Sequence, residues 1–204
     1  MGNLVMLPVP GLITQDWLAN KTGGITPDPN GTPMQQLVAR YGNYQDAGHD
    51  GLDQDGRTGD PIVAPGSGRV DYAGPGELMP ADMAAKWGFI YGPGGWGSGN
   101  ITLLDHGLGF GTYHAHQSRV HAPTGAWLEA GQLLGYVGNT GRSGGDHLHW
   151  SLVAFPVNYQ DPLYSRRNPL QYLPAGITIP YTGGGKGAPD AGRRTLCKIP
   201  GIYI

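Results

Sequence analysis

Glycine and proline recur along almost the whole chain, at 37 and 18 of its 204 residues. Most of the glycines stand singly between short apolar runs such as 62–64 and 101–104. This pattern is typical of short strands joined by tight turns, and 39% hydrophobic residues are enough to form a core. We therefore predict a mainly β fold, with strands at 60–64, 68–73, 100–105, 110–116, 132–137 and 147–154.

Composition divides the chain into three parts. Residues 1–44 combine loop-forming residues with one helical candidate, 34–41, whose apolar residues follow the i, i+3, i+4, i+7 spacing of an amphipathic helix. The strand-and-turn pattern occupies 45–174, and 175–204 has the Gly-rich composition of a tail or a linker to further domains. Residues 75–98 are expected to form a long surface loop, and such loops are usually functional.

Charge and hydropathy exclude several classes of partner. The formal net charge is −2 without a block of like charges, unlike the basic surface of a nucleic-acid binder. No apolar run approaches the ~18 residues of a membrane span, and no signal peptide is visible at the N-terminus. The single cysteine, Cys197, cannot form an internal disulfide. We expect no nucleic-acid partner and no membrane insertion.

Two of the seven histidines form the motif His147-Leu148-His149. On a strand, residues i and i+2 project to the same side, whereas on a helix they do not face each other. The neighbouring Trp150 and Leu152 favour a strand, so both imidazoles should enter one space. Two imidazoles on one face form half of a typical zinc site.

The second half of such a site is the pair His49 and Asp53, whose spacing places both on one face. Imidazole and carboxylate are both preferred zinc ligands, and three protein ligands with a fourth position left to water are typical of a catalytic site. Two neutral imidazoles and one carboxylate leave the centre cationic, which suits the polarisation of a carbonyl.

A second H-x-H pair, His114 and His116, lies on another strand candidate. Spacing alone does not decide which pair binds the metal. Hydrolysis also needs groups beside the metal that accept a proton and stabilise an oxyanion. Four histidine ligands would leave none of these, so a division of roles is chemically more useful.

The sequence from about residue 45 to 174 resembles the lysostaphin-like zinc endopeptidases of peptidase family M23. The likeness rests first on the H-x3-D segment at 49–53 and on 140–149, which is similar to the family pattern T-G-x-S-T-G-x-H-L-H. Further similar segments follow in the family's order, at 59–70, 99–107, 125–135 and 168–173.

The resemblance implies an antiparallel β-sheet domain whose long loops form the walls of a zinc groove. It implies one Zn²⁺ per chain, bound by His49, Asp53 and His149. It makes His116 and His147 the catalytic residues beside the metal, as general base and oxyanion stabiliser in either order.

In the segment similar to the family's T-x-Y-x-H-L, this chain has His114 where the family usually has Tyr and Gln117 where it has Leu. These two departures are expected to affect substrate contacts more than chemistry.

The implied function is hydrolysis of peptide bonds in the stem or crossbridge peptides of bacterial peptidoglycan by zinc-activated water. Action on the cell wall without a visible signal peptide suggests a phage endolysin, made in the host cytoplasm and released at lysis. A non-catalytic wall-binding or activator module is one alternative, and it should lack a ligand or a catalytic histidine. A virion tail-associated lytic component is another. The bond cut and the oligomeric state are not readable from the sequence.

Other polar residues near these motifs are weaker candidates. His106 is expected to be structural and His121 an exposed loop residue. Asp50 and Asp146 flank the site, where they could hold a ligand or a substrate amine, but we expect them to be solvated acids. Tyr44, just ahead of the H-x3-D segment, is a candidate hydrogen-bond donor to an oxyanion.

Overall fold

The structure, a computed structural model, describes residues 3–41, 45–89, 97–179 and 194–195. Its main sheet has eight strands. They are β1 (Ile13–Gln15), β2 (Leu52–Asp55), β4 (Gly68–Pro75), β5 (Asn100–Asp105), β6 (Phe110–Gln117), β8 (Trp127–Leu128), β10 (His147–Ala154) and β11 (Arg166–Arg167).

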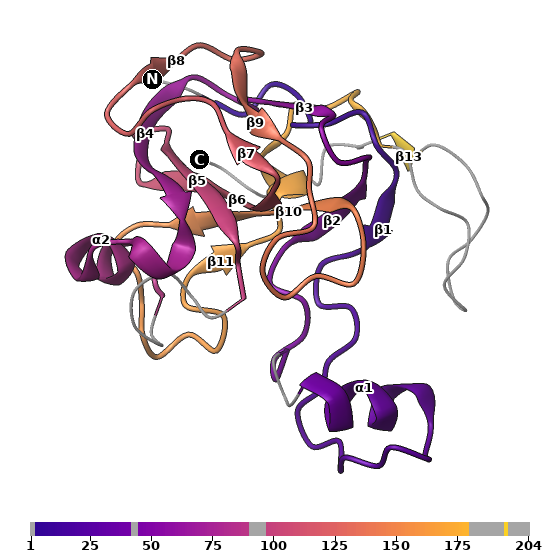
Figure 1. Cartoon of the computed structure of the whole chain (residues 1–204). Helices are drawn as coiled ribbons and strands as arrows, with labels where there is room; N and C mark the ends of the chain where they lie inside the picture. Colours follow the sequence, from indigo (N-terminus) through magenta and orange to yellow (C-terminus); the bar gives the residue numbers. More distant parts are fainter. Residues whose placement is uncertain (1–2, 42–44, 90–96, 180–193, 196–204) are drawn as a thin grey trace.

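The strand order is β1-β2-β10-β6-β5-β4-β8, with β11 paired to β10, and neighbouring strands are antiparallel (Figure 1). A smaller antiparallel sheet has the order β3-β9-β7, formed by β3 (Pro61–Val63), β9 (Leu133–Tyr136) and β7 (Arg119–Val120). The six predicted strands are all present, and the predicted mainly β, antiparallel fold is confirmed.

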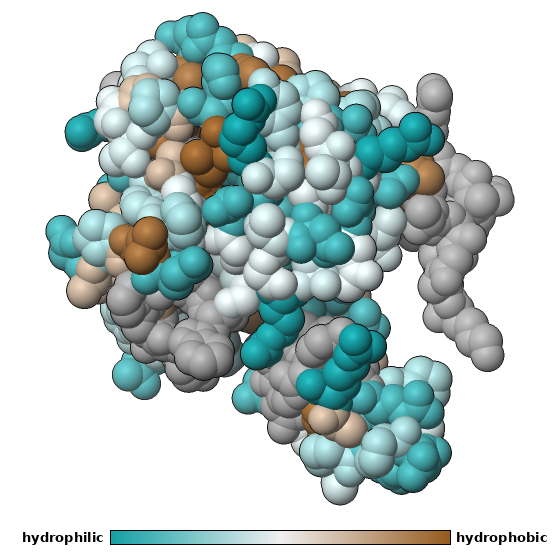
Figure 2. All heavy atoms as spheres, viewed as in Figure 1, coloured by the Kyte–Doolittle hydropathy of each residue, from teal (hydrophilic) through white to brown (hydrophobic). Residues whose placement is uncertain are grey.

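The remaining elements are short. They are the helices α1 (Pro33–Tyr41) and α2 (Ala81–Lys86), the 3-10 turns η1 (Gly76–Leu78) and η2 (Pro169–Tyr172), and the strand pair β12 (Thr178–Ile179) and β13 (Arg194–Thr195). Helix α1 matches the predicted helical candidate. It lies apart from the sheets (Figure 1), in a lobe that is mostly hydrophilic (Figure 2).

The central strand β10 separates two hydrophobic clusters. Leu148, Trp150 and Leu152 belong to the larger cluster, which also contains residues of the small sheet and of the N-terminal segment. Val153 belongs to the smaller cluster, on the other side. This alternation follows from the two-residue period of a strand, and it directs His147 away from the larger cluster.

The N-terminal segment contributes to the larger cluster through Leu4, Val9 and Ile13, and β1 pairs with the ligand-bearing strand β2. Residues before 45 therefore support the sheet. The domain boundaries at 45 and 174 stay predictions, and most of 175–204 lies outside the described residues.

The prediction that 75–98 is a long surface loop is wrong for the part that the structure describes. Residues 76–89 contain η1 and α2, and Trp87 after α2 is fully buried. Trp87 donates from Nε1 to Asp71 Oδ2 at 3.0 Å, and its ring fills space above Gly111 that a Cβ would occupy. A helix of six residues is too short to produce a visible periodicity. Residues 90–96 lie outside the described part.

The surface offers no evident large apolar patch on the face drawn in Figure 2, where hydrophobic residues form small separate groups. In the described part of the chain, none of the helices has the length and apolar character needed to cross a membrane.

Candidate active site

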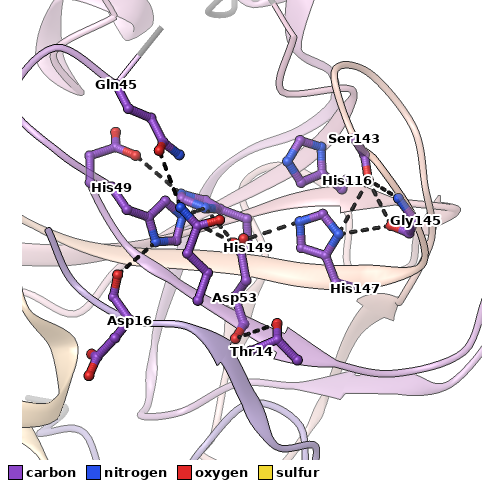
Figure 3. A network of polar contacts seen from close by, with 12 residues as sticks. Thr14, Asp16, Gln45, His49, Asp53, His116, Ser143, Gly145, His147 and His149 are labelled. Carbon is purple, nitrogen blue, oxygen red and sulfur yellow. Dashed lines mark hydrogen bonds and ion pairs between the residues drawn. The ribbon is translucent and has the colours of Figure 1, made fainter. Parts of the chain in front are cut away.

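The three predicted metal ligands meet where β2 and β10 lie side by side (Figure 3). Asp53 on β2 lies opposite His149 on β10 in the antiparallel register. His49, which precedes β2, places its Nε2 atom 3.0 Å from His149 Nδ1 and 3.2 Å from Asp53 Oδ1. His149 Nδ1 and Asp53 Oδ1 are 3.0 Å apart. Among the described residues, these three form the group that could hold a metal ion.

The donor set fits a zinc ion in chemistry and in size. Imidazole nitrogen and carboxylate oxygen bind zinc at about 2.0–2.1 Å, so two donors of a tetrahedral site lie about 3.3 Å apart. The three sides of the observed triangle, 3.0, 3.2 and 3.0 Å, are close to that value. Three protein donors leave a fourth tetrahedral position for a ligand that is not protein.

The N-terminal segment fixes the orientation of His49. The backbone N–H of His49 donates to the Ala19 carbonyl at 2.9 Å, and its carbonyl accepts from the Leu18 N–H at 2.9 Å. In the side chain, Nδ1 donates to the Asp16 carbonyl at 3.2 Å. Because a carbonyl only accepts, Nδ1 carries the proton, and the lone pair of Nε2 faces the other two ligands.

The charges of the site perturb its pKa values in opposite directions. Burial by itself would raise the pKa of Asp53, but the adjacent nitrogens of His149 and His49, which donate hydrogen bonds to its carboxylate when they are protonated, outweigh burial and hold that pKa well below its ordinary value. Burial by itself would lower the pKa of His49, but the hydrogen bond and charge of Asp53 raise it above the ordinary value. A proton therefore competes with a metal ion for His49 as the pH falls.

Strand β10 carries His147 and His149 on one side, as the H-x-H motif predicts. His147 Nε2 lies 3.6 Å from Asp53 Oδ1, the same oxygen that His149 contacts. The ring of His149 packs against the backbone at Gly51, where an added Cβ would lie 2.8 Å from His149 Nε2 and 2.6 Å from the Trp150 carbonyl. The absence of a side chain at Gly51 thus leaves room for the ring of the metal ligand His149.

The second H-x-H pair does not share one side, because β6 contains a bulge. Thr102 of β5 pairs with His114, and Asn100 pairs with Gln117, so β6 has one extra residue between these positions. His116 in that interval has a positive φ of 59°. A bulge of this kind re-aims a side chain. Here it turns His116 toward His147 and His149, whereas His114, in regular register opposite Trp150, is buried and stacked on that ring on the other side of the sheet.

His116 faces His147 beside the metal ligands, with ring centroids 4.8 Å apart (Figure 3). His116 Nδ1 donates to the Thr140 carbonyl, and His147 Nδ1 donates to the Gly145 carbonyl, both at 2.8 Å. Both rings therefore carry their proton on Nδ1 and keep the lone pair of Nε2. Burial, with the neighbouring histidines, lowers the pKa of His116 to about 4, so that His116 is neutral near pH 7.

The five residues lie in a groove of about 1170 Å³, which is large enough for a segment of peptide. Its walls include residues of 45–50, 88–89, 97–98, 142–144 and 162–166. The structure thus brings all five predicted site residues to one groove between loops.

The weaker candidates lie elsewhere or play other parts. His106 is buried and bonded to the Ser67 carbonyl at 2.9 Å, as expected of a structural histidine, and His121 is exposed. Asp146 is exposed and accepts from the Thr58 N–H at 2.8 Å. Tyr44 lies outside the described residues.

The sequence reasoning missed two groups on the outer side of the ligands. One is the Asp16 carbonyl, for which no side-chain motif could give a signal. The other is Arg166, whose Nε atom lies 2.8 Å from Asp50 Oδ2. The expectation that Asp50 is merely a solvated acid is therefore wrong. Its partner comes from a distant part of the sequence, so no local pattern could indicate the pair.

Comparison with known proteins adds a family assignment to this geometry. The model of Peptidase family M23 matches residues 47–162. DD-carboxypeptidase/endopeptidase Mpg of Neisseria meningitidis serogroup B is 34% identical over 91 residues, 44% of this chain and 21% of that protein. Peptidoglycan DD-endopeptidase ShyA of Vibrio cholerae serotype O1 is 38% identical over 63 residues, 30% of this chain and 15% of that protein. The matched stretches thus span about a fifth or less of these relatives.

Among solved structures, the chain is similar to the catalytic domain of the prophage-encoded M23 protein EnpA from Enterococcus faecalis, crystallised as a point mutant. The TM-score is 0.50 at 23% identity, over 82% of this chain and 95% of that one. A likeness at this identity shows the shared fold.

Proposed function

The chain belongs to peptidase family M23, and we propose that it is a zinc-dependent endopeptidase that hydrolyses peptide bonds in the stem or crossbridge peptides of bacterial peptidoglycan. The observation that carries the proposal is the triangle of His49, Asp53 and His149 donors with His116 and His147 beside it. The names of the relatives Mpg and ShyA, both described as endopeptidases, support the substrate class.

In this proposal one Zn²⁺ per chain is held by His49 Nε2, Asp53 Oδ1 and His149 Nδ1. When bound, zinc with two neutral imidazoles and one carboxylate would polarise a carbonyl and lower the pKa of water. The hydrogen bond from His49 Nδ1–H to the Asp16 carbonyl directs the Nε2 lone pair of the neutral ring to the cation, and the low pKa of Asp53 keeps its carboxylate charged.

His116 and His147 supply proton transfer and hydrogen bonding in this proposal. Each has Nδ1–H committed to a backbone carbonyl, so its Nε2 lone pair accepts a proton from the attacking water. Once protonated, the same Nε2–H donates to the oxyanion or to the departing amine. Their 4.8 Å centroid separation lets both reach one reacting centre. The ring that acts as base starts with its Nε2 lone pair free, whereas the ring that stabilises the oxyanion must carry a proton on Nε2 to donate a hydrogen bond. The pH–rate profiles of the two single variants would assign the two roles.

The non-catalytic alternative is not favoured, since it predicts the loss of a ligand or a catalytic histidine. All five residues are present, and the structure brings them together. We further propose that the chain acts on the bacterial cell wall. Release as a phage endolysin and a role in a virion tail stay predictions.

The test is digestion of purified walls that carry direct or glycine-bridged crosslinks, with and without a chelator, and identification of new peptide termini by mass spectrometry. We expect termini that appear with zinc and disappear with chelator. The proposed function would be refuted if the zinc-loaded protein released no new termini from any wall.

Two substitutions separate catalysis from metal binding. His116→Ala should retain one zinc per chain and lose about 10²–10⁴-fold in cleavage rate. His49→Ala should lose the metal, and with it part of the folding free energy. His121→Ala, in an exposed residue outside the groove, is the matched control and should cleave like the wild type. Loss of zinc from His116→Ala would show that the roles are assigned wrongly.

A further inference from the structure

An ion pair lies on the outer side of the ligand His149. Asp50 Oδ1 is 3.6 Å from His149 Nε2, and the other oxygen of Asp50 is 2.8 Å from Arg166 Nε. We propose that Asp50, held in place by Arg166, is a positioning residue that orients His149 for metal binding. This inference rests on the proposed zinc site, to which it adds two residues outside the metal's own ligands.

The two nitrogens of His149 face different groups. Nδ1 faces Asp53 and His49, so it is the atom that meets a metal. A neutral imidazole that binds through Nδ1 must carry its proton on Nε2. The carboxylate of Asp50 faces that Nε2, and it favours the tautomer with the proton there. A carboxylate at this position also fixes the ring plane and makes the ligand nitrogen more basic.

Arg166 gives Asp50 a defined position. Although Asp50 is partly exposed, the Arg166 side chain is buried, and its guanidinium lies 5.1 Å from the ring centre of Phe89 and 6.0 Å from that of Tyr113. Arg166 NH1 also donates to the Gly88 carbonyl at 3.4 Å. A buried guanidinium beside two rings and a backbone carbonyl has little freedom, so its charge holds the carboxylate beside His149 through an ion pair in which the Nε–H makes no hydrogen bond.

The pair also preserves the charge of the centre. Asp50 and Arg166 carry opposite charges and cancel, so the two neutral imidazoles and one carboxylate still leave a bound divalent cation with a net positive charge. A lone carboxylate behind His149 would lower that charge. Arg166 thus permits a carboxylate to orient the ligand without weakening the polarising power of the site.

The two histidine ligands are oriented by different groups. His49 donates Nδ1–H to a neutral backbone carbonyl, at Asp16, which no substitution of the side chain can remove. His149 depends on a side-chain carboxylate, which can be removed. Of the two histidine ligands, only His149 therefore has an orienting group that a substitution can remove.

Asp50→Ala removes the carboxylate but also leaves the buried Arg166 without its anion, which destabilises the fold. The double variant Asp50→Ala/Arg166→Met removes both charges and keeps an apolar side chain beside the two rings. Arg166→Met alone keeps the carboxylate behind His149. Asp46→Ala is the matched control, because Asp46 is an exposed acid that lines the same groove.

The measurements are the zinc dissociation constant, by competition with a chromophoric chelator, and the thermal midpoint of the apo proteins. We expect Asp50→Ala to bind zinc about 10–100-fold more weakly than the wild type. The double variant should recover much of the thermal midpoint but bind zinc as weakly as Asp50→Ala. Arg166→Met should lose less zinc affinity than either, and Asp46→Ala should match the wild type.

Two results would overturn the inference. One is a double variant that regains wild-type zinc affinity, because the pair would then serve stability alone. The other is an Asp50→Ala protein whose zinc affinity lies within about twofold of Asp46→Ala. Neither result would contradict the proposed function, which is refuted only if the zinc-loaded wild-type protein does not cleave any wall.

Discussion

Replacement of His114 by Phe should reduce the amount by which the free energy of unfolding decreases at acid pH. His114 is fully buried on the side of the sheet opposite the candidate active site, stacked on Trp150 with 6.5 Å between ring centroids and 6° between planes. Its Nδ1 donates to the Thr102 carbonyl at 3.3 Å, and within the described residues its Nε2 has no hydrogen-bond partner. Burial lowers the pKa of His114 from 6.5 to about 3.

The size of the effect follows from the two pKa values. Because the folded-state pKa is depressed, the unfolded chain binds the proton first as the pH falls, and the free energy of unfolding decreases from about pH 6.5 down to about pH 3. The loss approaches about 1.4 kcal/mol per pH unit, which amounts to about 2 kcal/mol between pH 7 and pH 5. Phe is planar like imidazole, although its ring is larger, and it has no proton to bind.

At pH 7 the two proteins should differ by about 1–3 kcal/mol or less, because Phe loses one long hydrogen bond, removes one unpaired nitrogen and has the larger ring. This difference does not depend on pH and serves as the baseline. At pH 5, His114→Phe should be the more stable by about 2 kcal/mol relative to that baseline. The assay is urea unfolding at pH 7, 6 and 5 with a chelator present, so that metal binding does not contribute. His121→Phe, in an exposed histidine, is the control. Parallel pH profiles for wild type and His114→Phe would refute the reasoning.

Two further outcomes concern the metal ligands. Gly51→Ala places a Cβ 2.8 Å from the His149 ring, so it should weaken zinc binding by on the order of tenfold or more. The control is Gly144→Ala in the same groove, where an added Cβ has open space and should leave zinc binding unchanged. Equal zinc affinity of the two variants in a chelator competition would contradict this prediction. Because Asp53 raises the pKa of His49 above its ordinary value of 6.5, protons should begin to compete with zinc above pH 6.5, and zinc affinity and wall cleavage should decline together as the pH falls further. Zinc affinity that stayed constant down to pH 4 would count against histidine ligation.

The long strands were predictable because their residues carry the pattern that burial imposes. Strand β10 has apolar residues at Leu148, Trp150 and Leu152 and polar ones between, so its H-x-H motif correctly indicated two imidazoles on one side. Strand β2 contains Asp53, Gln54 and Asp55 in four residues, and nothing in that composition indicates a strand. It forms because β10 pairs with it.

The split of the histidines on β6 could not be obtained from spacing. His114 and His116 have the same i, i+2 relation as the pair on β10, yet a bulge sends them to opposite sides. The residue with positive φ is His116, not a glycine, so the sequence carries no local mark of the bulge. Only the resemblance to a family indicated which of the two belongs to the site. A non-glycine residue held in this region is strained, and such strain gathers at functional positions.

The metal ligands were predictable from the sequence, whereas the groups that orient them were not. Each predicted ligand lies within residues 47–162, the stretch that matches the family model. The groups that hold two of those ligands lie partly outside it, since Asp16 precedes that stretch and Arg166 follows it. A short motif specifies donor atoms, because the chemistry of zinc limits which atoms can bind. It does not specify a hydrogen-bond partner for the far side of each ring, because a carbonyl from any segment or a carboxylate can serve. The precision of the site therefore depends on segments that no motif marks, and it is there that substitutions should change zinc affinity without changing a ligand.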